Sequence, residues 1–120
     1  MARIVIAAFN QVLPSALTGI QDLFYLAGMK LPEGKNHVYA SDENVWLPDI
    51  MVASMDGNPI VDGQGRAYSV DMSLQDIKRC DAVLIPGFVP NQVAHPPTAL
   101  LDESAKLWLN KQYQQGAIIA

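Results

Sequence analysis

The feature of this sequence that most constrains its fold is the apolar run of residues 81–87, Asp-Ala-Val-Leu-Ile-Pro-Gly. A strand that is apolar on both faces is typical of a parallel sheet covered by helices on both sides. Such sheets bind ligands in the crevice beyond the carboxyl ends of their strands. The run therefore predicts a central strand, and we expect any functional site near its carboxyl end, at Pro86 and Gly87.

Other patterns extend this strand to an α/β fold. Residues 3–9 and 49–55 are apolar runs that predict two further strands, and residues 117–120 predict the beginning of another. Pro14 and Ser15 suit the first turn of a helix. That helix is indicated by apolar residues at spacings of three and four, namely Leu17, Ile20, Phe24 and Ala27. We expect the strands of residues 3–9 and 81–87 to be neighbours in the centre of the sheet.

The remaining segments predict shorter elements. Residues 60–70 read as a small hairpin around Asp62-Gly63-Gln64-Gly65 or as a pair of edge strands. Ser73 can cap a short helix that runs through Cys80. A last helix begins at Thr98 or Asp102 and ends at Gly116; its apolar side carries Leu101, Ala105, Trp108 and Leu109. Residues 29–48 hold many helix and strand breakers, so they predict a connecting loop with a short strand at 37–40. The expected fold is a three-layer, flavodoxin-like, mostly parallel sheet with helices on both faces and a small β-hairpin.

Length and composition limit the function classes. The chain has 120 residues, half of them apolar, which suffices for one domain with a core of its own. Its net charge is -4 and its eight Lys and Arg are scattered, so we expect no direct binding of nucleic acid and no attachment to a membrane surface. The apolar run near the N-terminus is too short for a signal peptide or a membrane helix.

The cysteine and histidine counts exclude further chemistry. Cys80 is the single cysteine, which excludes an intrachain disulfide and a zinc site of several cysteines. The two histidines show no metal-ligand spacing, so we expect neither a metal nor a cofactor. A reduced, cytoplasmic setting fits best. Because the chain stops four residues into a strand, we expect residues 1–120 to be the N-terminal part of a longer domain, with no second domain among them.

Five motifs follow one another along the chain. They are the first strand followed by residues 19–24, residues 54–61, residues 71–74, residues 80–87, and the last helix leading into residues 115–120. In this order they resemble the ThiJ/PfpI superfamily, which has a class I glutamine amidotransferase-like fold, and its branch of AraC-type transcriptional regulators. The resemblance covers nearly the whole chain.

The resemblance implies where an enzyme of this superfamily would hold its catalytic groups. A cysteine on a sharp elbow would follow the strand of residues 117–120, and Cys80 lies at the opposite end of the sheet, where we expect a structural thiol. An acidic residue early in the first helix would contact that cysteine, but Ala16 stands at this position. Phe88 replaces a second glycine after Gly87, where many members offer backbone N–H groups to an oxyanion.

Side chains that follow the two central strands form the preferred site hypothesis. Amide groups beside an aromatic ring are typical of small-molecule pockets. The candidate ligand-binding residues are Asn10, Gln11, Gly87, Phe88, Asn91 and Gln92. The alternative, that these are ordinary polar loop residues, stays open.

Three other polar groups have simpler interpretations. Asp22 lies beyond the first turn of its helix, so a solvated or helix-packing aspartate is the preferred interpretation over a catalytic acid. His95 has no nucleophile beside it in sequence and is interpreted as a surface residue. Asp56-Gly57 and Asp62-Gly63 are turn formers rather than a calcium loop.

The resemblance therefore favours a non-catalytic sensor or dimerisation domain of an AraC-family transcriptional regulator, a homodimer that binds a small metabolite, with a DNA-binding helix-turn-helix region downstream of this chain. The alternative is a cysteine-dependent ThiJ/PfpI-type enzyme, acting as a hydrolase, a glyoxalase-like enzyme or an isonitrile hydratase-like enzyme. A third class is a pure oligomerisation module.

Overall fold

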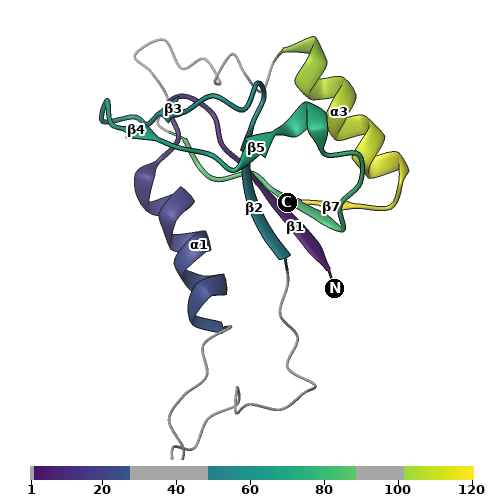
Figure 1. Cartoon of the computed structure of the whole chain (residues 1–120), viewed down its shortest axis with the longest axis horizontal. Coiled ribbons are helices and arrows are strands. Elements are labelled where there is room, and N and C mark those ends of the chain that lie inside the picture. Colours follow the sequence, from purple (N-terminus) through teal and green to yellow (C-terminus); the bar gives the residue numbers. More distant parts are fainter. Residues whose placement is uncertain (1, 28–48, 89–101) are drawn as a thin grey trace, which may run out of the picture.

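The computed structural model describes residues 2–27, 49–88 and 102–120, and the fold is given for this part of the chain (Figure 1). Its centre is a parallel five-stranded sheet in the order β5-β2-β1-β6-β7. The strands are β1 (Arg3–Ala7), β2 (Asp49–Ser54), β5 (Met72–Ser73), β6 (Ala82–Leu84) and β7 (Ile118–Ile119). The predicted α/β fold class is confirmed, and so is the pairing of β1 with β6 at the sheet centre.

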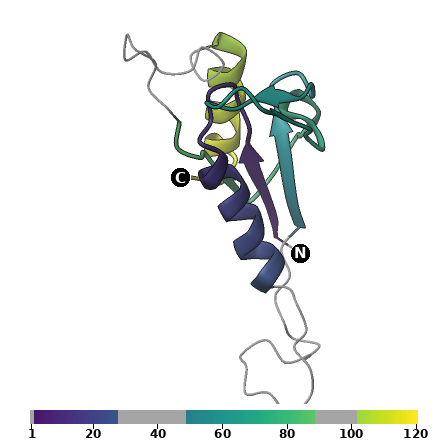
Figure 2. The ribbon, with the colours of Figure 1, turned by 90° about the vertical axis from the view of Figure 1, so that its left-hand side faces the viewer.

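Two helices cover the two faces of this sheet. Successive side chains of β1 point to opposite faces, because a strand has a period of two. Val5 belongs to the apolar cluster that contains Trp108 of α3 (Glu103–Gln114), and Ile6 belongs to the cluster that contains Leu17 of α1 (Pro14–Ala27). Figure 2 shows α1 in front of the strands and α3 behind them. This two-sided burial explains why the central strands are apolar at nearly every position.

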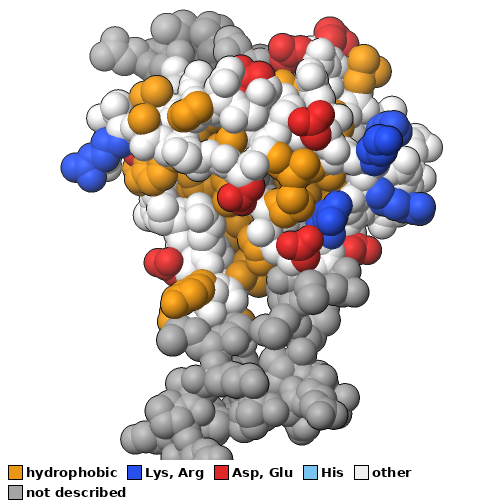
Figure 3. Space-filling view, in the orientation of Figure 1, with side chains coloured by type: hydrophobic (Ala, Val, Ile, Leu, Met, Phe, Trp, Pro, Cys, Tyr) orange, Lys and Arg blue, Asp and Glu red, His pale blue; other side chains and the backbone are white. Residues whose placement is uncertain are grey.

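The first helix begins at Pro14, as predicted, and it is only partly covered. Leu17 is buried, and the other residues of the predicted apolar stripe are partly buried. Large apolar side chains on the outer side of the helix are exposed: Leu23 (65%), Tyr25 (69%) and Leu26 (58%). Figure 3 shows such apolar side chains at the surface on the side of the molecule where α1 lies. The second half of α1 thus leaves apolar surface open.

The last helix begins at the second of its two predicted starts. Asp102 is its N-cap, and its Oδ1 accepts a hydrogen bond from the Ser104 N–H at 2.8 Å. The helix ends at Gln114, two residues before Gly116, which has a φ of 96°. Ala105 and Trp108 are buried as predicted, and Gln112 is a buried polar residue that the apolar pattern missed.

The predicted hairpin is confirmed as an antiparallel pair. Its strands are β3 (Ile60–Val61) and β4 (Ala67–Tyr68), and Ile60 is paired with Tyr68. Asp56 and Asp62 form turns, as predicted. Asp56 Oδ1 accepts the Asn58 N–H at 3.0 Å, and Asp62 Oδ1 accepts the Gln64 N–H at 2.8 Å.

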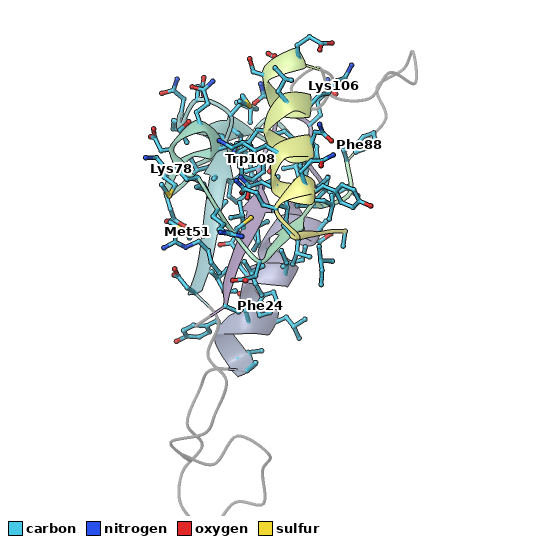
Figure 4. All side chains as sticks on the ribbon, turned by 90° about the vertical axis from the view of Figure 1, so that its right-hand side faces the viewer. Phe24, Met51, Lys78, Phe88, Lys106 and Trp108 are labelled. Carbon is cyan, nitrogen blue, oxygen red and sulfur yellow. The ribbon has the colours of Figure 1, made fainter. Side chains whose placement is uncertain are left out.

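The predicted helix from Ser73 through Cys80 is wrong in its length. Ser73 does cap a helix, since its hydroxyl accepts the Gln75 N–H, but the element is a single 3-10 turn, η1 (Leu74–Asp76). Beyond it, α3 takes over the backbone groups that a longer helix would have used. Trp108 Nε1 donates to Ile77 O at 2.9 Å, and Gln112 Nε2 donates to Lys78 O at 3.1 Å. Figure 4 shows Trp108 on the side of α3 that faces the sheet.

Some sequence predictions lie outside the described residues. They are the connecting loop at 29–48 with its short strand, Leu101, Thr98, and the loop that carries Asn91, Gln92 and His95. Within the described residues, no helix is both long enough and apolar enough to cross a membrane.

Candidate functional site

The segments that follow β1 and β6 are hydrogen-bonded to one another. Because the two strands are parallel neighbours, the segments that follow them leave the sheet at the same edge. Val12 and Phe88 form an isolated antiparallel bridge, and the Leu13 N–H donates to Gly87 O at 2.9 Å. The structure therefore brings together four of the six predicted site residues: Asn10, Gln11, Gly87 and Phe88.

Aromatic side chains form one part of this crevice. The rings of Phe9 and Phe88 meet edge to face, with centroids 6.1 Å apart and planes inclined by 70°. Such contacts add about 0.5–1.5 kcal/mol beyond the burial of the rings. Phe9 is buried, whereas Phe88 is only partly buried, so part of Phe88 remains accessible. The Phe88 ring is thus held in place by the neighbouring Phe9 ring.

Asn10 and Gln11 are constrained by the hairpin. Asn10 Oδ1 accepts the Val61 N–H at 3.0 Å, and the Gln11 N–H donates to Val61 O at 2.9 Å. The Asn10 Nδ2 group makes no hydrogen bond with the described residues and is the part of the amide left for a ligand. Gln11 has a φ of 72°, the left-handed region, which is unusual for a residue with a side chain.

The space around residue 87 does not require a glycine. A Cβ built on Gly87 would meet Leu13 Cδ1 at 3.4 Å, an ordinary contact with the end of a flexible side chain. Residue 87 therefore has room for a small side chain.

A small apolar hollow lies beside the crevice, under α3. It has a volume of about 20 Å³ and is lined by Ala7, Ala8, Phe9, Met55, Leu74, Ala105 and Leu109. A volume of this size holds about one water molecule, whereas ligand pockets for drug-sized molecules measure roughly 300–1,000 Å³. This hollow is therefore too small for a drug-sized ligand.

A larger hollow lies at the amino edge of the sheet, away from the crevice. It is open, has a volume of about 390 Å³, and is lined by Arg3, Asp49, Arg79, Cys80 and Asp81. Its carboxylates already bind Arg3: Asp49 Oδ2 lies 3.3 Å from Arg3 Nε, and Asp81 Oδ2 accepts the Arg3 N–H at 2.7 Å. We interpret these contacts as structural, because they link the amino ends of β1, β2 and β6.

Cys80 has the environment of a structural thiol. It is buried, and its Sγ lies 3.4 Å from Oε1 of Gln112, which also accepts the Cys80 N–H at 3.2 Å. Burial raises the pKa of the Cys80 thiol above its ordinary value of 9.0, and Asp81 raises it further, although Arg3 opposes the shift. A thiol with a raised pKa is a poor nucleophile, because the thiolate is the reactive form.

The first helix brings no acid to the crevice. Its first turn contains no acidic residue, and Ala16 is partly buried there. Asp22 lies further along the helix and is exposed, as expected for a solvated aspartate.

Comparison with known proteins places the fold. No family model and no curated protein matches the sequence. Solved structures of the DJ-1/ThiJ/PfpI superfamily match 98–99% of this chain at 10–16% identity. The chain thus has the DJ-1/ThiJ/PfpI fold, which confirms the fold expected from the resemblance.

Three of these structures illustrate the range. Oxidized DJ-1 of Toxoplasma gondii matches 99% of this chain with a TM-score of 0.68 at 16% identity, and 54% of its own length is covered. An AraC family transcriptional regulator of Pseudomonas putida has a TM-score of 0.65 at 16% identity, with 99% of this chain and 62% of that chain covered. A ThiJ/PfpI family protein of Pseudomonas syringae has a TM-score of 0.67 at 10% identity, with 98% and 40% covered. The chain therefore spans roughly half the length of the structures it matches.

Proposed function

We propose that this chain is part of the effector-sensing domain of an AraC-family transcriptional regulator. A small metabolite binds at the carboxyl-edge crevice, against Asn10, Gln11, Gly87 and Phe88, and Asn91 and Gln92 are kept as further candidate ligand-binding residues. DNA binding belongs to a helix-turn-helix region outside residues 1–120. The observation that carries the proposal is the direct joining of the two segments after β1 and β6, which places amide groups and an aromatic ring at one edge.

The site supports binding better than catalysis. The sequence holds one cysteine, and it is buried at the amino edge with a raised pKa. The first turn of α1 offers Ala16 instead of a carboxylate. The likeness in fold to a Pseudomonas putida AraC family regulator supports the same choice. A cytoplasmic location follows from this role and agrees with a single unpaired cysteine.

The alternative is a cysteine-dependent enzyme of the hydrolase, glyoxalase-like or isonitrile hydratase-like kind. One observation favours it. The Ala120 N–H donates to Val83 O at 2.9 Å, and Ala120 O accepts the Ile85 N–H at 2.7 Å. A residue that followed Ala120 would stand at the crevice edge, close to Gly87. A cysteine there would occupy the place of the superfamily's nucleophile.

Two experiments together distinguish the regulator from the enzyme. One reads the coding frame beyond Ala120, and the other assays the encoded protein for turnover. A basic region with helix-turn-helix units and no turnover of methylglyoxal supports the regulator. A cysteine immediately after Ala120, with turnover that is lost when this cysteine becomes serine, overturns it. Turnover that instead depends on Cys80 would also overturn our assignment of Cys80 as structural.

A homodimer is part of the same proposal, and the outer face of α1 supports it. Ser15 and Gly19 lie on this face toward the helix start, and the exposed Leu23 and Leu26 lie toward its end. In an antiparallel pairing about a two-fold axis, the large residues of one copy would cover the small residues of the other. A Cβ on Gly19 would meet nothing within 4 Å, so the face is open to close approach.

Light scattering on the purified protein tests this pairing. The wild type should have twice the mass of one chain, and Gly19→Arg should reduce it to one chain. Thr18→Arg, a similar change beside that face, is the control. A monomeric wild type, or equal masses for the two variants, would overturn the pairing.

A further inference from the structure

The segment that follows β1 is hydrogen-bonded to the hairpin along its length. Val61 uses both of its backbone groups for this contact, donating to Asn10 Oδ1 at 3.0 Å and accepting from the Gln11 N–H at 2.9 Å. The Gly63 N–H donates to Val12 O at 3.0 Å. Figure 1 shows β3 beside the purple segment that leads from β1 to α1.

The opposite side of the same segment is bonded to the end of β6. The Leu13 N–H donates to Gly87 O at 2.9 Å, and Val12 is bridged to Phe88. Residues 60–68, 10–13 and 87–88 are therefore linked without interruption, and we call this set the crevice ribbon. It runs from Phe88, at the candidate site, to the exposed hairpin turn at 63–66.

A buried carboxylate fixes the outer end of the ribbon. Asp62 is 4% exposed, and its Oδ1 accepts the N–H groups of Gln64 at 2.8 Å and Arg66 at 2.9 Å. Asp62 Oδ2 is buried and makes no hydrogen bond with the described residues. Burying a charged group with an unsatisfied oxygen is costly, so its position calls for an explanation. The turn that Asp62 holds is the one that directs the Gly63 N–H at Val12 O.

Backbone strain marks the middle of the ribbon. Gln11 is the one residue other than glycine with a positive φ among the described residues. Such conformations persist where surrounding contacts impose them, and they gather at ligand-binding and switching segments. Here the contacts come from the hairpin on one side and from Gly87 and Phe88 on the other. A change on either side would alter the balance that keeps Gln11 in this conformation.

We propose that the crevice ribbon transmits changes at Phe88 to the exposed hairpin, with Asp62 as the positioning residue that keeps the ribbon in register. The identity of the occupant at Phe88 rests on the proposed function. The transmission itself does not rest on the proposed function, because it depends only on hydrogen bonds within the protein. In the regulator, the hairpin surface would report whether the crevice is filled.

Amide hydrogen exchange tests the role of Asp62, since exchange measures local opening residue by residue. Asp62→Asn keeps an acceptor for the turn but removes the charge, and it should raise exchange on the order of tenfold at Gly63, Gln11 and Leu13, as expected for a weakened hydrogen bond. Asp56→Asn is the matched control, because Asp56 also precedes a glycine in a turn but does not contact the ribbon. The proposal fails if the change stays within residues 62–66, or if both variants affect Gln11 and Leu13 equally.

A second pair of variants tests transmission from the other end. Phe88→Ala should raise exchange at Val61 and Gly63, whose N–H groups are hydrogen-bonded to Asn10 and Val12 and not to residue 88. Leu109→Ala removes a similarly half-buried side chain on the α3 side of the sheet and should leave these two amides unchanged. Equal exchange at Val61 and Gly63 in the two variants, both folded by circular dichroism, would overturn the proposal. This outcome leaves the ligand-binding proposal standing, because binding at Phe88 does not require transmission.

Discussion

The side-chain Oε1 of Gln112 accepts two hydrogen bonds from Cys80, one from its backbone N–H at 3.2 Å and one from its thiol at 3.4 Å. The same amide donates from Nε2 to Lys78 O at 3.1 Å. One polar side chain of α3 thereby supplies hydrogen-bond partners to the backbone of residues 78–80, which form no helix. It also keeps the thiol inside the protein.

We predict that Gln112→Ala lowers the free energy of unfolding by about 2–3 kcal/mol, because it leaves the buried Cys80 N–H and the partly buried Lys78 O without their partners. Urea denaturation followed by circular dichroism measures this loss. Gln114→Ala is the control, since Gln114 is exposed on the same helix and its loss should change the free energy of unfolding little. A similar loss in both variants would contradict the assignment.

We predict that the Cys80 thiol reacts with iodoacetamide only when the protein opens. Its pKa is raised mainly by burial, so the folded state holds the proton more tightly than the unfolded state. The stabilisation from the neutral thiol is therefore complete below the ordinary value of 9.0 and is lost as the pH rises toward the higher folded pKa. Alkylation at pH 8 should be slow in buffer and fast in denaturing urea. Rapid alkylation of the native protein would show that Cys80 is accessible and reactive.

We predict that Gln11→Gly is neutral or stabilising, by up to about 1 kcal/mol, because glycine adopts a positive φ without steric cost. Gln11→Val should destabilise the protein, since a β-branched residue fits this conformation worst. Thermal denaturation of the two variants measures the difference. Greater stability for valine than for glycine would contradict a left-handed backbone at residue 11.

We predict that Asp62 contributes to acid sensitivity. Burial raises its pKa, but the N–H groups of Arg66 and Gln64 and the positive charge of Arg66 lower it, and the net pKa lies below its ordinary value of 3.8. The hydroxyl of Tyr68 lowers the pKa further, although its position falls short of a hydrogen bond. Stability from the ionised form is therefore present above the ordinary value and is lost as the pH falls through the lower folded pKa. Urea midpoints between pH 2 and 6 should fall less steeply for Asp62→Asn than for the wild type, and parallel curves would contradict this prediction.

The pairing of β1 with β6 at the sheet centre was predictable from sequence because it depends on apolar patterning. The runs at β1 and β6 are apolar at nearly every position, which indicates burial on both faces. Two parallel neighbours then place Asn10 and Gly87 at one edge. The hairpin was predictable from its turn residues, which favour tight turns for local reasons.

Long-range hydrogen bonds explain what sequence patterns missed. Residues 73–80 have a good cap and inward-facing Leu74 and Ile77, yet Trp108 and Gln112 compete for the backbone groups of that segment. The contact of Val61 with Asn10 joins residues 51 positions apart, and no local pattern indicates it. Gln11 adopts a positive φ because of these contacts and not because of its own preference. The functions of Asn91 and Gln92 stay predictions.

The central claim, that the carboxyl-edge crevice is a ligand site of a non-catalytic sensor, is tested most directly by an NMR titration of the isotope-labelled protein with a panel of small metabolites. The account predicts saturable shifts of the Asn10 side-chain amide and of the Gln11 and Phe88 backbone amides, with no chemical change in the bound compound. Shifts that gather instead at Arg3, Cys80 and Asp81, the absence of any saturable shift, or conversion of the compound would contradict it.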